Sequence, residues 1–194
     1  MHKGRLEAFS DGVIAIIITI MVLELEVPHG ADWEALRPIV PVFFAYVVSF
    51  VYLGIYWNNH HHMLQMTEKT SGGILWANLH LLFWLSLVPF TTAWMGENHF
   101  APLPTAVYSA VLLFAGVAYV VLQQAIIRHQ GPRSKLAAAV GRDWKGKLSA
   151  TLYAFAIPLA FVNPWIAHAI VVFVALLWLV PDRRIERTLT YREE

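Results

Sequence analysis

The residues able to do chemistry in this chain are polar side chains that interrupt apolar segments. The first segment, residues 6–27, contains Ser10, Asp11 and Thr19 among Ile, Val and Leu. An Asp at the centre of a membrane-spanning helix costs about 2.5–3.5 kcal/mol on insertion scales, so it requires a partner or a water-filled path. Hydroxyl groups can replace part of a cation's hydration shell. Proton transfer and cation passage are therefore the two kinds of chemistry that this segment suggests.

A helix through this segment would have two different faces. At about 100° per residue, one stripe collects a small residue, a hydroxyl and bulky apolar side chains: Phe9, Gly12, Ile16, Thr19 and Leu23. The opposite side collects Glu7, Ser10, Asp11, Ile14 and Ile18. If several copies of the stripe met at an axis, rings of Ile16 and Leu23 would close a path by dewetting, and a ring of Thr19 would contact cations. Ordinary helix packing, with the Thr hydroxyl bonded to its own backbone, is the alternative.

Polar residues of the second apolar segment are expected at a depth similar to that of Asp11, and those of the third segment somewhat deeper. Asn59 and His60 lie near the end of the second segment, and Asn78 and His80 lie within the third. A buried network joining the first three helices would satisfy all these groups. A proton relay through Asp11, His60 and His80 would use the same residue types, so both interpretations stay open.

The elements that must position these residues are predicted to be six membrane-spanning helices. The chain has 194 residues, of which 58% are hydrophobic and 14% charged, and its mean hydropathy is +0.54; soluble domains carry about 25% charged residues. Since a span needs roughly 17–25 apolar residues, we expect spans at 6–27, 39–63, 72–95, 106–127, 148–162 and 165–180. The last two are short, and we expect a tight hairpin with Pro158 kinking the fifth. The predicted fold is all-α, with residues 1–194 forming one domain.

Basic residues predict the orientation of these spans. With both termini inside, every Lys and Arg except Arg37 is cytoplasmic, as the positive-inside rule requires. The cytoplasmic group consists of Lys3, Arg5, Lys69, Arg128, Arg133, Lys135, Arg142, Lys145, Lys147, Arg183, Arg184, Arg187 and Arg192. An even number of spans follows from this distribution. The basic loop 128–147 is a topology signal, with contact to anionic membrane lipids as the alternative.

Several function classes are excluded by what the sequence lacks. It has no Gly-rich phosphate loop, no His-Glu-x-x-His, no Gly-x-Ser-x-Gly and no cysteine, so ATP-driven pumping and familiar hydrolytic or thiol chemistry are not expected. Neither an Arg-rich voltage sensor nor the usual potassium-filter sequence is present. Three consecutive histidines at 60–62 point about 100° apart on a helix and cannot converge on one metal. We expect no enzyme activity, no cofactor, no bound metal and no nucleic-acid partner.

The string Arg5-x-x-x-Phe9-Ser10-Asp11-Gly12 resembles the signature of the transmembrane protein 175 family of lysosomal potassium channels, particularly its bacterial six-helix members. The sharp motif is confined to the first helix, although length and span number are also similar. In that family the first helix lines the pore. Because the motif occurs once here, the resemblance implies a homotetramer around a central pore.

The same resemblance assigns roles to individual residues. It places the hydrophobic constriction at Ile16, a potassium-favouring threonine layer at Thr19 and the next hydrophobic layer at Leu23. Arg5 and Asp11 would be structural motif residues. Ala15 stands where strongly selective members have serine, which implies only a modest preference for K⁺ over Na⁺.

The sequence thus predicts a potassium-permeable, weakly selective cation channel in the inner membrane of a bacterium. Its partners would be copies of itself, membrane lipids and monovalent cations, with K⁺ as the permeant ion. A proton-coupled secondary transporter with an intramembrane Asp/His relay is the alternative.

Overall fold

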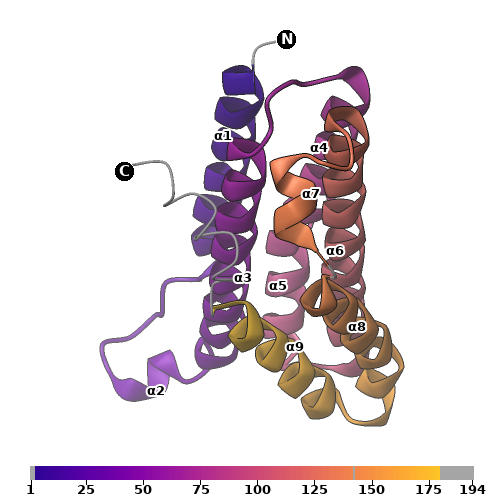
Figure 1. Cartoon of the computed structure of the whole chain (residues 1–194). Coiled ribbons are helices and arrows are strands. Elements are labelled where there is room, and N and C mark those ends of the chain that lie inside the picture. The colour runs from indigo at the N-terminus through magenta and orange to yellow at the C-terminus, as the bar shows by residue number, and fades with distance from the viewer. Residues whose placement is uncertain (1–2, 142, 180–194) are drawn as a thin grey trace.

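The computed structural model describes residues 3–141 and 143–179, and all the regular elements among them are helical (Figure 1). The elements are α1 (Lys3–Met21), the 3₁₀ turn η1 (Val22–Glu24), α2 (Trp33–Leu36), α3 (Val40–Gln65), α4 (Gly72–Ser86), α5 (Val88–Glu97), α6 (Pro102–Gln130), α7 (Lys135–Val140), α8 (Trp144–Val162) and α9 (Pro164–Leu179). The prediction of an all-α chain is confirmed.

Four helical stretches among the described residues are long and apolar enough to cross a membrane: Lys3–Glu24, Val40–Gln65, Gly72–Glu97 and Pro102–Gln130. They correspond to the first four predicted spans. The fifth predicted span falls on α8, and the sixth falls on α9, which has 16 residues. At about 1.5 Å per residue, α9 is about 24 Å long, less than the ~30 Å hydrocarbon core. Six crossings therefore stay a prediction, and the end of the sixth predicted span at residue 180 lies outside the described residues.

Proline explains why the third span consists of two helices. A proline lacks the N–H that would bond to the carbonyl four residues earlier, and its ring clashes with that carbonyl. Pro89 accordingly lies in the first turn of α5, and α4 ends at Ser86. Pro158, which was expected to kink the fifth span, lies inside α8, and α8 continues through it.

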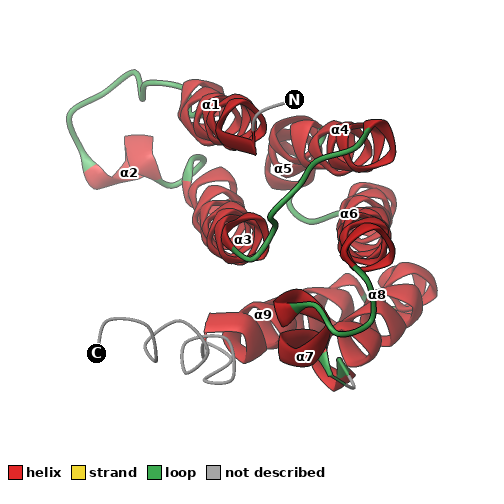
Figure 2. Ribbon diagram, turned by 45° about the horizontal axis from the view of Figure 1, so that its top comes forward, coloured by secondary structure: helices red, strands yellow, loops and turns green. Residues whose placement is uncertain are grey.

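The helices pack side by side as a bundle with α8 and α9 along one flank (Figure 2). α6 packs against α4 and α8, α3 packs against α5, and α1 packs against α3, α4 and α5. α5 and α3 approach each other closely at Gly96 on α5. A Cβ added there would lie 2.7 Å from Val42 Cα on α3, so a glycine is required at this position. The segment carrying α2 projects from the bundle, and Trp33 in it is 87% exposed.

The positions of the helix ends show that the long helices alternate in direction, and the side of the membrane on which each end lies stays a prediction. The start of α1 lies at the same end of the bundle as the ends of α3 and α6 (Figure 1), which alternating spans require. Of the basic residues used in the orientation argument, Arg142, Arg183, Arg184, Arg187 and Arg192 lie outside the described residues.

Candidate permeation face and the polar brace behind it

Of the two predicted faces of α1, the stripe is exposed, whereas the opposite face is only partly buried: Ser10 and Ile14 are buried, and Glu7, Asp11 and Ile18 are half-buried. Ile16 is 58% exposed and Phe9 is 52% exposed, and Gly12 and Thr19 are exposed as well. The face turned toward α3, α4 and α5 is buried and consists of Leu6, Ser10, Ile14, Ile17 and Met21. The helical register of the stripe was therefore predicted correctly as far as Thr19, and nothing in the described part of the chain covers it.

The outer end of the stripe differs from the predicted helix. The α-helix ends at Met21, and Leu23 lies in η1, the 3₁₀ turn. Because a 3₁₀ turn has about three residues per turn, the position of Leu23 does not follow from the 100° rotation. Leu23 is nevertheless 77% exposed, so its side chain also stays free of the rest of the protomer.

The hydroxyl of Thr19 bonds to its own helix. Thr19 Oγ1 donates to the backbone oxygen of Ile16 at 3.0 Å, which is the ordinary packing arrangement weighed above. The bond uses the hydroxyl proton and leaves the oxygen lone pairs on an exposed side chain. A Thr19 oxygen in this state can still coordinate a cation through its lone pairs.

Behind the stripe, a short buried chain of hydrogen bonds joins α1, α4 and α3. Asn78 is completely buried; its Nδ2 donates to Ser10 Oγ at 2.9 Å, and its Oδ1 lies 2.7 Å from His60 Nε2. Because an amide oxygen carries no proton, His60 Nε2 must be the donor. Ser10 Oγ in turn donates to the backbone oxygen of Leu6 at 2.8 Å. We call Ser10, Asn78 and His60 the polar brace.

Three other predicted members of the network lie outside the polar brace. Asp11 Oδ1 accepts from Trp57 Nε1 at 3.0 Å, at a partly exposed contact between α1 and α3. Asn59 Nδ2 bonds to the backbone of its own helix at 2.8 Å. His80 lies on an exposed face of α4 and accepts from Trp84 at 3.0 Å. In the described part of the chain, hydrogen bonds therefore do not connect Asp11, His60 and His80 into a relay.

The remaining residues of the predicted motif face outward. Arg5 is exposed in the first turn of α1, on the same side as the stripe, and Phe9 lies one turn further on. The histidines at 60–62 diverge as predicted: His60 faces Asn78, whereas the His61 ring stacks on Trp57 at 5.8 Å. Within residues 3–141 and 143–179, no group of three or more His, Cys, Asp or Glu could hold a metal ion.

A second buried polar cluster involves residues that the sequence reasoning did not use. Ser49 Oγ on α3 lies 2.7 Å from Thr92 Oγ1 on α5 and 2.9 Å from Tyr108 Oη on α6. One turn further along α3, Tyr52 donates to a backbone oxygen of α9 at 2.5 Å and accepts from Tyr153 of α8 at 2.9 Å. These contacts attach α3 to four other helices. The sequence signal for them was two hydroxyl groups, at Ser49 and Tyr52, three residues apart within the apolar part of α3.

Comparison with known proteins gives a consistent result. A family model described as "Endosomal/lysosomal potassium channel TMEM175" matches residues 5–89. A potassium channel from a Chryseobacterium species is 55% identical over 189 residues, covering 97% of this chain and 98% of that protein. A potassium channel from Streptomyces collinus is 34% identical over 173 residues, covering 84% of each chain. The crystal structure of a lysosomal potassium-selective channel TMEM175 homolog from Chamaesiphon minutus superposes with a TM-score of 0.76 and 26% identity, covering 92% of this chain and 96% of that chain.

Proposed function

The chain belongs to the TMEM175 family of potassium channels, and from this premise we propose that four copies assemble into a potassium-permeable channel lined by α1. The family consists of multi-pass membrane channels, which are not enzymes and need no cofactor. The permeant ion would be K⁺, and the protein's partners would be its own copies, the surrounding lipids and monovalent cations.

The observation that carries this proposal is the exposed stripe on α1. A lipid-facing helix of a single protomer has no need for a glycine and a threonine among large apolar residues, yet Gly12 and Thr19 lie on the uncovered face. An added Cβ at Gly12 would meet nothing within 4 Å in this chain. A small residue on this uncovered face supports the proposal, because close approach of several α1 helices favours one there.

Side-chain rings would replace the backbone-carbonyl filter of other potassium channels. Four Ile16 side chains at a narrow axis would exclude water and form the constriction, and Leu23 would form a second apolar layer. Four Thr19 oxygens with free lone pairs would contact the ion between them. Ala15 supplies no further hydroxyl next to the constriction, so we expect only a weak preference for K⁺ over Na⁺.

The cellular setting follows from the distribution of charge and from the bacterial relatives. We place the protein in the inner membrane of a bacterium with six spans and both termini in the cytoplasm. The alternating direction of the helices (Figure 1) supports this orientation, and so does the positive-inside rule, because this topology leaves Arg37 as the one basic residue of the sequence on the outside.

Flux measurements in purified proteoliposomes test the site assignment. Ile16→Ala should raise passive K⁺ flux about tenfold, the change expected if the barrier falls by about 1.4 kcal/mol. Thr19→Ala should lower the ratio of K⁺ to Na⁺ flux. Ile166→Ala is the matched control, because Ile166 is an exposed isoleucine on α9, outside the stripe.

Two results would contradict the proposal. Unchanged flux and selectivity in both α1 variants would refute the site assignment. Slow, saturable flux that moves protons with a second solute would instead favour a proton-coupled transporter.

A further inference from the structure

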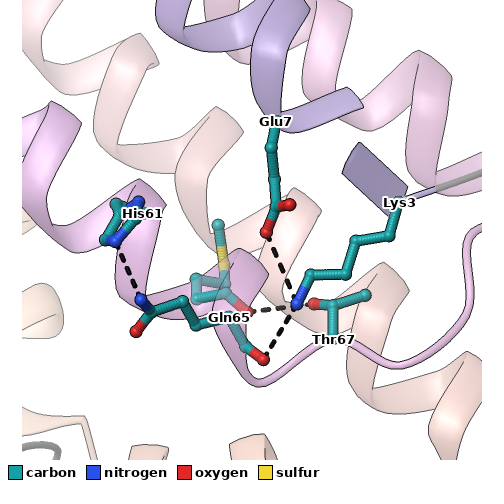
Figure 3. Close-up of polar contacts among 6 residues, drawn as sticks. Lys3, Glu7, His61, Gln65 and Thr67 are labelled. Carbon is teal, nitrogen blue, oxygen red and sulfur yellow. Dashed lines mark hydrogen bonds and ion pairs between the residues drawn. The ribbon is translucent and has the colours of Figure 1, made fainter. Parts of the chain in front are cut away.

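The first turn of α1 is attached to the last turn of α3 by a lysine (Figure 3). Lys3 Nζ donates to the backbone oxygen of Gln65 at 3.0 Å and lies 3.4 Å from Glu7 Oε1. Lys3 is the first described residue of α1, and Gln65 is the last residue of α3. The contact therefore joins the two helices at the end of the bundle that we assign to the cytoplasm.

The chemistry of this contact is that of a cation at a helix C-terminus. The last carbonyl groups of a helix have no partner within it, and the end of the helix carries partial negative charge. At Gln65, a lysine from a neighbouring helix can donate a hydrogen bond to the unpaired carbonyl and place a positive charge next to the partial negative charge of the helix end. Glu7, one turn after Lys3 on the same helix, pairs with the ammonium group and orients it toward that carbonyl.

Among the residues that the structure describes, the polar contacts of α1 to other helices lie in the half of α1 that we assign to the cytoplasmic side. They involve Lys3, Ser10 and Asp11. From Gly12 to Met21, Thr19 is the single polar side chain, and it bonds to its own helix. Within the described residues, the outer half of α1, which carries the candidate constriction, is thus held by apolar packing, through Ile14, Ile17 and Met21.

We infer that Lys3 is a positioning residue that fixes the tilt of α1 by anchoring its first turn on the C-terminus of α3, with Glu7 orienting it. This inference rests on the proposed function, because a helix that lines the conduit transmits its tilt to the constriction. When the anchor is lost, the cytoplasmic end of α1 moves more freely and the aliphatic ring admits water more often. Passive K⁺ flux then rises.

Four variants separate this role from simple charge effects. Lys3→Met should raise K⁺ flux about two- to fivefold, the range expected from one cation at a helix C-terminus. The exchange Lys3→Glu/Glu7→Lys keeps the net charge and allows an ion pair, but it places a carboxylate next to the Gln65 carbonyl; it should raise flux as well. Lys3→Arg should behave like the parent. Lys69→Met is the matched control, because it removes an exposed cation from the loop after α3.

A second readout does not depend on ion flux. The chain has no cysteine, so a variant with Gly4→Cys and Glu68→Cys carries spin labels at these two positions and nowhere else. Mixing labelled with unlabelled chains limits the measured distances to pairs within one chain. The distance distribution between α1 and the loop after α3 should broaden with Lys3→Met and stay as in the parent with Lys69→Met.

Each result decides the inference. If the charge exchange restores the flux of the parent, an ion pair explains the effect and the inference is overturned. If Lys69→Met raises flux as much as Lys3→Met does, general electrostatics explains the effect and the inference is overturned as well. An unchanged distance distribution in Lys3→Met would overturn the anchor whatever the flux. If the parent passes no K⁺ while the distances respond as expected, the channel function fails and the anchor itself is supported.

Discussion

Replacing Asn78 by leucine tests whether the polar brace holds α1 in place. The two side chains have similar size, but leucine can neither donate to Ser10 nor accept from His60. Ser10 keeps its bond to the backbone of its own helix, so its proton stays satisfied. His60, which is 1% exposed, is left with an unpaired N–H in the interior.

The expected loss of stability follows from these contacts. Hydrogen bonds between membrane helices contribute about 0.6 kcal/mol on average, so two such bonds give about 1.2 kcal/mol. An unsatisfied buried donor adds about 1 kcal/mol, at the low end of its usual range. We therefore expect Asn78→Leu to lower the free energy of unfolding by about 2 kcal/mol, which changes the ratio of folded to unfolded protein about thirtyfold.

The assay is reversible denaturation in detergent, followed by the fluorescence of the eight tryptophans. The double variant Asn78→Leu/His60→Phe removes both partners of the shorter bond and leaves no orphaned imidazole. It should therefore cost about 1 kcal/mol less than the sum of the two single variants. The brace would be refuted if Asn78→Leu were as stable as the parent, or if the loss of stability in the double variant equalled the sum of the losses in the two single variants. Loss of proton-coupled transport at unchanged stability would point to a relay instead.

Two further predictions concern close packing and the second polar cluster. Gly96→Ala should destabilise the chain by about 1–3 kcal/mol, because the new methyl group would collide with Val42. Gly12→Ala, where the protomer leaves room, should not lower the stability of one chain, since alanine favours a helix more than glycine does, and should alter K⁺ flux. Tyr52→Phe should cost about 1 kcal/mol, measured by the same denaturation assay, because Tyr153 loses its acceptor and a carbonyl of α9 loses its donor; unchanged stability would show that water replaces the missing hydroxyl.

The sequence was sufficient for the parts of the fold that depend on regular helical geometry. The stripe on α1 was predicted in the correct register because the segment is a regular α-helix from Lys3 to Met21. Leu23 could not be placed in the same way, because the switch to a 3₁₀ turn is a local choice that periodicity does not report. The break at Pro89 carried a readable signal that was not used.

The contacts of the polar residues were also predicted only in part. Depth along the helices associated Ser10, His60 and Asn78, and hydrogen bonds join these three residues in the structure. Depth says nothing about rotation, however. Asn78 and His80 are two positions apart and point about 200° apart on one helix, so both could not enter the same network. Considering helical phase as well as depth would have excluded His80.

The polar brace closes within a single polypeptide, and this has a consequence for how the complex is built. A newly inserted copy can pair Ser10, Asn78 and His60 before it meets its siblings. Its uncovered α1 stripe is mostly apolar and can rest against acyl chains in the meantime. Under the four-copy arrangement, biogenesis then proceeds in two separate stages, and a lone subunit waiting in the bilayer encloses no conduit through which the cell could leak ions.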